Sequence, residues 1–157
     1  VASRQPLLEH EKPSTEEQDM YKRIAVAIDG TPNALGAVRE AAELAKIHQS
    51  DSVALVTVVS ERAYTKANRE AIEAQGANET KIVSSAMELL DKATIKNELV
   101  MLHGAAVAEI AQYVDGAGVE LLVVGDGYLK KIHKSSGNGS TTKKISREVN
   151  CPVLIVK

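Results

Sequence analysis

Short apolar runs alternate with amphipathic stretches from Tyr21 to the end of the chain. The runs are rich in Val, Ile, Leu and Ala and have the length of buried strands, at 24–28, 53–59, 98–102, 119–124 and 152–156. Between them, apolar residues recur three and four positions apart, which predicts helices at 33–49, about 62–93, after Gly104, and 141–149. Gly76 and Asn78 are candidate interruptions of the long second helix.

This alternation predicts an α/β fold with a five-stranded, mostly parallel sheet and helices on both faces. We expect the strand order 3-2-1-4-5, in which the first and fourth strands are neighbours. Ligands of such sheets bind at the carboxyl ends of the strands, where the strand order reverses. The expected order brings the loop that starts at Asp29 next to the loop that starts at Gly125.

Composition and charge narrow the class of protein. Residues 1–20 are polar, contain Pro6 and Pro13 and show no sustained period, so we interpret them as a disordered tail or an added remnant. Residues 21–157 then form one domain. The net charge of −2 gives no general attraction to nucleic acid or to an anionic membrane. A single cysteine, no apolar run of membrane-spanning length and no visible signal peptide lead us to expect a cytoplasmic protein.

The last third of the chain carries the most distinctive candidate chemistry. The strand at 119–124 runs into Gly125-Asp126-Gly127, and a basic loop leads to Gly139-Ser140-Thr141 at the start of a helix. A glycine loop that ends at a helix N-terminus can bind an anion, because its backbone N–H groups have no other partners. The alternatives are a turn after a buried strand and an ordinary serine N-cap.

The loop after the first strand offers a carboxylate at the same expected crevice. Asp29-Gly30-Thr31 ends the run at 24–28, and the carboxylate could accept hydrogen bonds from ligand hydroxyl groups. The alternative is an Asx turn or a cap on the following helix. No Cys/His cluster and no nucleophile elbow is present, so we expect neither a metal site nor hydrolase chemistry.

Three features in this order resemble the universal stress protein family over 21–157: the Asp29-Gly30-Thr31 turn, the glycine loop ending in Gly139-Ser140, and the closing strand Cys151-Pro152-Val153-Leu154-Ile155-Val156. The resemblance implies an adenine-nucleotide alpha-hydrolase-like fold and a regulatory role in stress response. It also implies that the protein binds ATP, or ADP or AMP in its place, and it leaves open whether Mg²⁺ accompanies the nucleotide. The protein would be at most a slow ATPase, without dedicated catalytic residues.

The resemblance also assigns roles to single residues. Asp29 would contact a ribose hydroxyl, with Gly30 and Thr31 beside it, and Val58 would meet the adenine. The phosphates would lie against Gly125, Gly127, Gly139, Ser140 and Thr141. Lys130 and Lys131 are candidate phosphate contacts, although a run of charge is more often a solvated face.

The glycine loop differs from that of the family's nucleotide-binding members, which carry Gly-x2-Gly-x9-Gly-Ser/Thr. Here the spacing from Gly125 to Gly139 is one residue longer, and Gly127 stands one place early. This difference favours an alternative function, a structural or adaptor dimer that binds no nucleotide. Under either function we expect a homodimer through the strand Val153–Val156, which is apolar and would otherwise be an exposed sheet edge.

Overall fold

The computed structural model of the protein describes residues 20–59, 68–126 and 141–157. Its sheet has five strands in the order β3-β2-β1-β4-β5, and each recorded pairing is parallel. The predicted α/β fold and the predicted strand order are therefore confirmed. The strands are β1 Arg23–Ala27, β2 Ser52–Val59, β3 Asn97–His103, β4 Leu121–Gly125 and β5 Val153–Val156.

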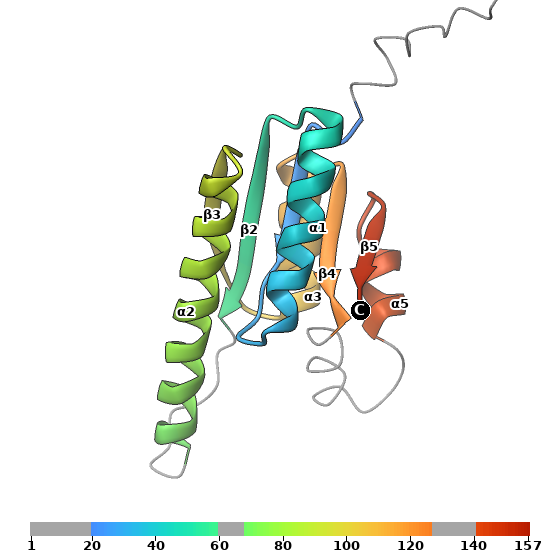
Figure 1. Cartoon of the computed structure of the whole chain (residues 1–157). Helices are drawn as coiled ribbons and strands as arrows, with labels where there is room; N and C mark the ends of the chain where they lie inside the picture. The colour runs from blue at the N-terminus through green and yellow to red at the C-terminus, as the bar shows by residue number, and fades with distance from the viewer. Residues whose placement is uncertain (1–19, 60–67, 127–140) are drawn as a thin grey trace, which may run out of the picture.

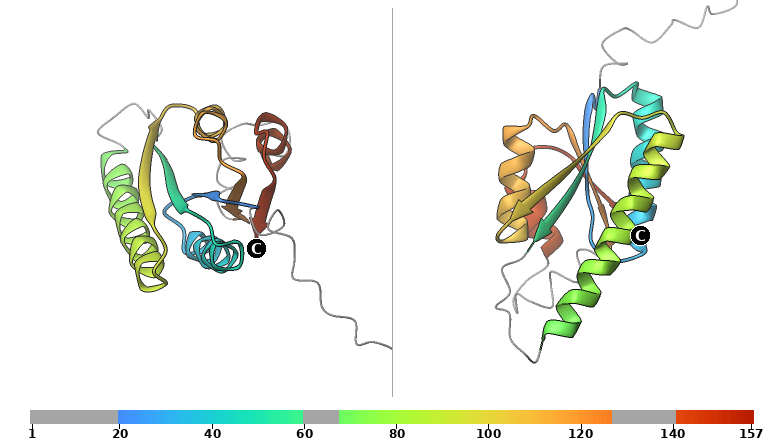
Figure 2. Two further views of the ribbon diagram at one scale, coloured as in Figure 1. Left: turned by 90° about the horizontal axis from the view of Figure 1, so that it is seen from above. Right: turned by 90° about the vertical axis from the view of Figure 1, so that its left-hand side faces the viewer.

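Helices cover both faces of the sheet (Figures 1 and 2), and each face has its own cluster of buried apolar residues. Helices α1 (Asn33–His48) and α2 (Arg69–Lys92) pack on one face, and α3 (Ala106–Gly116) and α5 (Thr141–Glu148) on the other. Alternate side chains of a strand point to opposite faces, so β1 contributes Ile24 and Val26 to one core and Ala25 and Ala27 to the other. The two-sided burial explains why β1 and β4 contain no polar residue after Arg23.

Helix α2 runs without a break through Gly76 and Asn78, so the predicted interruption is wrong. A glycine within a helix costs only about 1 kcal/mol relative to alanine. The packing of Ala86 and Leu90, both completely buried, offsets that cost from the other end of the helix. The helix begins at Arg69, and the earlier residues predicted to belong to it, 62–67, lie outside the described residues.

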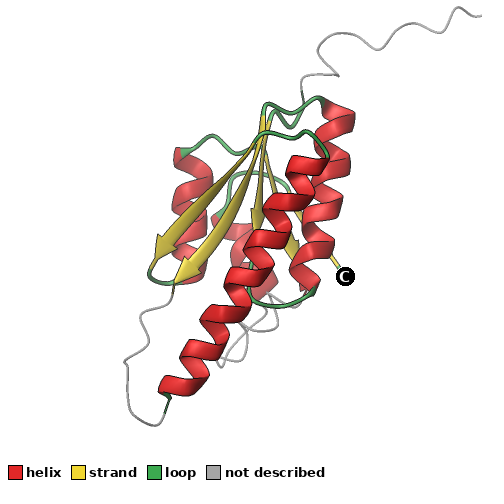
Figure 3. Cartoon of the chain, turned by 60° about the vertical axis from the view of Figure 1, so that its left-hand side comes forward, coloured by secondary structure: helices red, strands yellow, loops and turns green. Residues whose placement is uncertain are grey.

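The length of α2 shapes the surface around it. Its 24 residues span about 36 Å, whereas the eight residues of β2 span about 26 Å. The first turns of α2 therefore extend past the carboxyl ends of the strands (Figures 1 and 3). Only its second half supplies fully buried residues. The first half of α2 stands over the end of the sheet without closing onto it.

Candidate functional site

The carboxyl ends of β1, β2 and β4 meet at the point where the strand order reverses. Ala27 is paired with Val56 on one side and with Val124 on the other, and the Ile28 N–H donates to the Val56 carbonyl at 2.8 Å. The next residue along, Asp29, therefore lies between the ends of β2 and β4. The structure brings Asp29, Val58 and Gly125 to the carboxyl end of the sheet, as the sequence predicts.

Asp29 is the central polar group of this end of the sheet. It is only 5% exposed, and its Oδ1 accepts hydrogen bonds from the backbone N–H of Thr31, at 3.0 Å, and from the Thr31 hydroxyl. This is the Asx turn that the sequence offered as an alternative. The other oxygen, Oδ2, is buried and has no hydrogen-bond partner among the described residues. The turn thus accounts for one carboxylate oxygen and leaves the second available for a ligand.

An unpaired buried carboxylate oxygen carries a cost of about 1–3 kcal/mol or more, so its retention suggests a ligand donor. Helix α1 begins four residues later, at Asn33, and the positive end of its dipole lies at this end of the sheet. That dipole favours a negative group here. The arrangement can accept one further hydrogen bond from a hydroxyl or an N–H of a bound molecule.

Gly125 has a packing reason to be glycine. A Cβ atom at this position would lie 3.1 Å from the carbonyl oxygen of Asn33, at the start of α1. Real Cβ contacts are rarely that close, and backbone cannot easily move away. The glycine therefore allows the end of β4 to pack against α1, whatever else it contacts.

Gly30 joins the crevice to helix α2. A Cβ atom on Gly30 would lie 3.0 Å from Cγ of Glu79 and 3.5 Å from its backbone nitrogen. The loop after β1 therefore rests directly on the middle of α2. Glu79 in turn accepts a hydrogen bond from Nε2 of Gln75 at 3.0 Å. A substitution at Glu79 would therefore alter the packing against the turn that holds Asp29.

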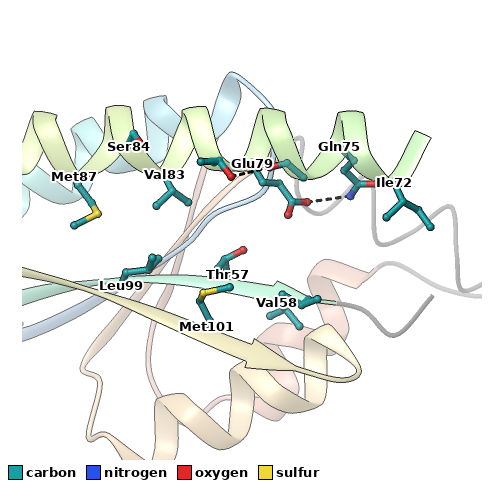
Figure 4. Close-up of a pocket in the computed structure, with 13 residues that line it drawn as sticks. Thr57, Val58, Ile72, Gln75, Glu79, Val83, Ser84, Met87, Leu99 and Met101 are labelled. Carbon is teal, nitrogen blue, oxygen red and sulfur yellow. Dashed lines mark hydrogen bonds between the residues drawn. The ribbon is translucent and has the colours of Figure 1, made fainter. Parts of the chain in front are cut away.

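A cavity of about 770 Å³ lies between α2 and the carboxyl halves of β2 and β3 (Figure 4). Val58, the predicted adenine contact, is part of its wall. The residues that line it are Thr57, Val58, Val59, Ile72, Gln75, Gly76, Glu79, Thr80, Val83, Ser84, Met87, Leu99 and Met101. The cavity is the space that α2 leaves open above the sheet from Ile72 to Met87.

Thr57 is a residue of this region that the sequence analysis missed. In the described part of the chain, only Thr57 and Asp29 are polar residues that are buried, at 7% and 5% exposure. They lie at the ends of neighbouring strands. The signal was a lone threonine within the otherwise apolar run at 53–59, which a strand core does not require.

Several predicted site residues lie outside the described part of the chain: Gly127, Lys130, Lys131, Gly139 and Ser140. Thr141 is the first residue of α5, so the predicted start of that helix is confirmed. The phosphate-contacting roles remain predictions. Within the described ranges, no group of three or more His, Cys, Asp or Glu side chains is placed to hold a metal ion. No helix in those ranges is both long and apolar enough to cross a membrane.

The parallel sheet of order 3-2-1-4-5 has the adenine-nucleotide alpha-hydrolase-like type of α/β fold. Comparison with known proteins identifies the family within this class. The sequence profile of the universal stress protein family matches residues 20–157. The chain belongs to that family.

Individual relatives agree with this assignment. The universal stress protein YxiE of Bacillus subtilis is 28% identical over 153 residues, which cover 88% of this chain and all of that protein. A crystal structure of a universal stress protein in complex with cAMP is 26% identical, with a TM-score of 0.62, and covers 87% of this chain and 97% of that one. A universal stress protein from Archaeoglobus fulgidus in complex with dAMP shares the fold, with 23% identity, a TM-score of 0.63, and 88% and 99% of the two chains covered.

Proposed function

We propose that this protein is an adenine-nucleotide-binding universal stress protein that holds ATP, or ADP or AMP, at the crevice between β1 and β4. The observation that carries the proposal is the buried, unpartnered Oδ2 of Asp29. A ribose offers adjacent hydroxyl groups, and a carboxylate is a strong acceptor for such donors. The bound nucleotide would supply the hydrogen bond that the described residues do not give to this oxygen.

The neighbourhood of Asp29 fits the other parts of a nucleoside. Val58 lies at the end of the adjacent strand β2, where an adenine attached to that ribose would pack on an apolar side chain. The loop after β4 starts at Gly125 on the opposite side, in the direction of the predicted phosphate cradle. The relative with bound cAMP supports an adenine nucleotide as the class of ligand. Occupancy of this crevice would be the signal that the protein transmits.

We propose further that the protein forms a homodimer through β5. This strand lies at one edge of the sheet and pairs with β4 on its inner side. Its residues Val153–Val156 are apolar yet only partly buried. Pairing across a two-fold axis would cover this edge, which sheets rarely leave exposed. Sedimentation should give a dimer at micromolar concentration, and a monomer at all concentrations would contradict this interface.

The adaptor dimer without nucleotide remains the second candidate, and one observation favours it. Gly125 is needed for the contact with Asn33, so its presence does not by itself indicate phosphate binding. The longer spacing to Gly139 points the same way. Measured affinity for ATP separates the two candidates.

The test is calorimetric titration of the full chain with ATP and Mg²⁺. We expect about one site per chain and micromolar affinity. Asp29→Ala should weaken binding about tenfold to a hundredfold, because a hydrogen bond to a charged group contributes about 1.5–3 kcal/mol. Gly139→Val should also weaken binding if the loop contacts phosphate.

The matched control is Asp51→Ala, which removes an exposed carboxylate from the amino end of the sheet, just before β2. It should leave the affinity unchanged. Absence of binding by the folded, nucleotide-free wild-type protein would reject the nucleotide function and favour the adaptor. Equal affinity of wild type and Asp29→Ala would reject the site as described.

A further inference from the structure

The cavity under α2 has the size and the lining of a small-molecule site. Its volume of about 770 Å³ falls within the range of roughly 300–1,000 Å³ that is usual for ligand pockets. Such pockets are mainly apolar, with a few polar groups that orient the ligand. This cavity therefore contains more space than a packing defect between a helix and a sheet, which would be small and dry.

Apolar side chains face one another across the cavity. On α2, Ile72, Gly76, Val83 and Met87 line the cavity and recur at helical spacing, as one apolar stripe. Figure 4 shows Ile72, Val83 and Met87 pointing toward the strands. Gly76 lies within this stripe, and a Cβ atom there would meet nothing within 4 Å. The missing side chain at Gly76 leaves room that a larger residue would fill.

The opposite wall is formed by strand β3. Leu99 and Met101 point toward α2 and are 39% and 57% exposed, so a large apolar surface meets solvent here. Burial of that surface by a ligand would contribute about 25 cal/mol per Å². Methionine side chains, here Met87 and Met101, adapt readily to the shape of a bound molecule.

A buried hydroxyl forms part of the floor. Thr57 is 7% exposed, lines the cavity, and points toward α2 in Figure 4. A threonine hydroxyl can both donate and accept a hydrogen bond. Ser84 and Thr80 also line the cavity; the Thr80 hydroxyl donates to the Gly76 carbonyl at 2.9 Å, so it can only accept from a ligand. A ligand with one carbonyl, hydroxyl or N–H group could bond to this set.

The charge of the lining limits the ligand further. Among the thirteen residues that line the cavity, Glu79 is the only ionisable one, and no Lys, Arg or His is among them. An anion would be desolvated there without a compensating positive charge from the described lining residues. A triphosphate is therefore a poor occupant of this cavity, although the crevice beside it suits a nucleotide.

We propose that the cavity between α2 and the ends of β2 and β3 is a second ligand site, which takes an uncharged, mainly apolar small molecule with one hydrogen-bonding group. This site adjoins the nucleotide crevice at Val58 and Glu79 but does not depend on the proposed nucleotide function. Its ligand contacts the underside of α2, the hydroxyl of Thr57 and the apolar face of β3.

The test uses two fluorescent probes that differ mainly by one charge. N-phenyl-1-naphthylamine is uncharged and has a single N–H group, whereas 8-anilinonaphthalene-1-sulfonate carries an added sulfonate. We expect the uncharged probe to bind the full chain saturably, at about one per chain. The sulfonate should bind at least about tenfold more weakly, because the lining offers it no positive charge.

Variants of α2 locate the probe. Gly76→Leu places a side chain inside the cavity and should weaken the uncharged probe at least about tenfold. Ala77→Leu adds the same side chain one position along, at an exposed residue outside the cavity lining, and should leave the affinity unchanged. Thr57→Val keeps the shape of the floor but removes its hydroxyl, and should weaken the probe about fivefold, the value of one neutral hydrogen bond.

Other results would overturn the proposal. These are the absence of saturable binding of the uncharged probe, or equal effects of Gly76→Leu and Ala77→Leu on folded protein. Competition between ATP and the probe, together with loss of ATP binding in Gly76→Leu, would assign the cavity to the nucleotide site instead. Asp29→Ala should weaken the binding of ATP and leave the affinity for the uncharged probe unchanged. Failure of the nucleotide proposal and failure of this one are therefore distinguishable.

Discussion

The two ends of the same parallel sheet differ in how completely their polar groups are paired. At the amino ends of the strands, the carboxylate of Glu120 accepts hydrogen bonds from the backbone N–H groups of Lys22 and Arg23. The Ser50 hydroxyl donates to the Tyr21 carbonyl at the same end. At the carboxyl ends, by contrast, Asp29 has a buried oxygen with no hydrogen-bond partner in the described part of the chain, and a cavity lies beside it.

This difference shows at which end of the sheet the described chain leaves a buried polar atom without a partner. Glu120 and Asp29 each accept two hydrogen bonds from the chain on one carboxylate oxygen. Glu120 is exposed, so water can reach its other oxygen, whereas the other oxygen of Asp29 is buried and has no partner among the described residues. Polar groups left unpaired in a folded protein cost free energy, so they are concentrated where a ligand can offset that cost. The hydrogen bonds at the amino end stabilise the sheet, and the buried oxygen at the carboxyl end is the group that the proposed nucleotide site would use.

The largest effect is expected at a residue of the carboxyl end that serves packing. In Gly125→Ala, the new Cβ atom would lie 3.1 Å from the carbonyl oxygen of Asn33, which is closer than such contacts usually are. This substitution should therefore lower the free energy of unfolding by about 1–3 kcal/mol. Gly116→Ala is the control, because a Cβ atom there meets nothing within 4 Å. Urea denaturation measures both. An unchanged stability with a large loss of ATP affinity would instead mean that Gly125 serves the ligand.

A smaller effect is expected when the amino end is opened. Glu120→Ala removes the acceptor of two backbone N–H groups that are near solvent, and should lower the free energy of unfolding by about 1 kcal/mol without changing ATP affinity. Asp29→Asn should have the opposite effects on stability and on binding. It should raise the free energy of unfolding by about 1 kcal/mol, because a buried charge is removed, and it should weaken ATP binding. Loss of ATP affinity in Glu120→Ala would break the comparison between the two ends.

The smallest effect concerns the thiol of Cys151, which lies just before β5, at the amino end of the sheet. Burial raises the pKa of this thiol, and backbone hydrogen bonds only partly oppose the shift. The folded state therefore favours the protonated thiol, and this contribution to stability is present below the unfolded pKa, about 8.5, and falls as pH rises above it. Reaction with a disulfide reagent between pH 7 and 10 should be slower in the folded than in the urea-unfolded chain, with its rise moved to higher pH. A faster reaction in the folded chain would show that this end is open.

Much of the architecture could be predicted from the sequence because strands and helices here follow their simple periods. The run at 24–28 is shifted by one residue from β1, and the run at 53–59 begins one residue after the start of β2. The rules of right-handed, short connections limit the possible strand orders, and the expected order 3-2-1-4-5 is the one that the structure has. The placement of Asp29 beside Val58 and Gly125 followed from that order alone.

The cavity and the orphaned oxygen could not be predicted, because both depend on distances between segments. Whether the stripe from Ile72 to Met87 touches Leu99 depends on how far α2 stands from the sheet. Gly76 was interpreted as a helix break, since glycine in sequence does not distinguish a break from an empty position on a helix face. Likewise, an Asp-Gly-Thr turn predicts one hydrogen bond to the carboxylate and gives no information about the other oxygen.

The central position of β1 has a consequence for how the protein forms during synthesis. β1 pairs with β2, which follows soon in the chain, and with β4, whose neighbour Glu120 is 98 residues from Lys22. Until β4 has emerged, the nascent chain can build only the half-sheet β3-β2-β1, whose apolar β1 edge is unpaired. Contacts of this sequence separation form slowly. The half-sheet is therefore the stage at which this chain is most exposed to pairing with another copy and to capture by a chaperone.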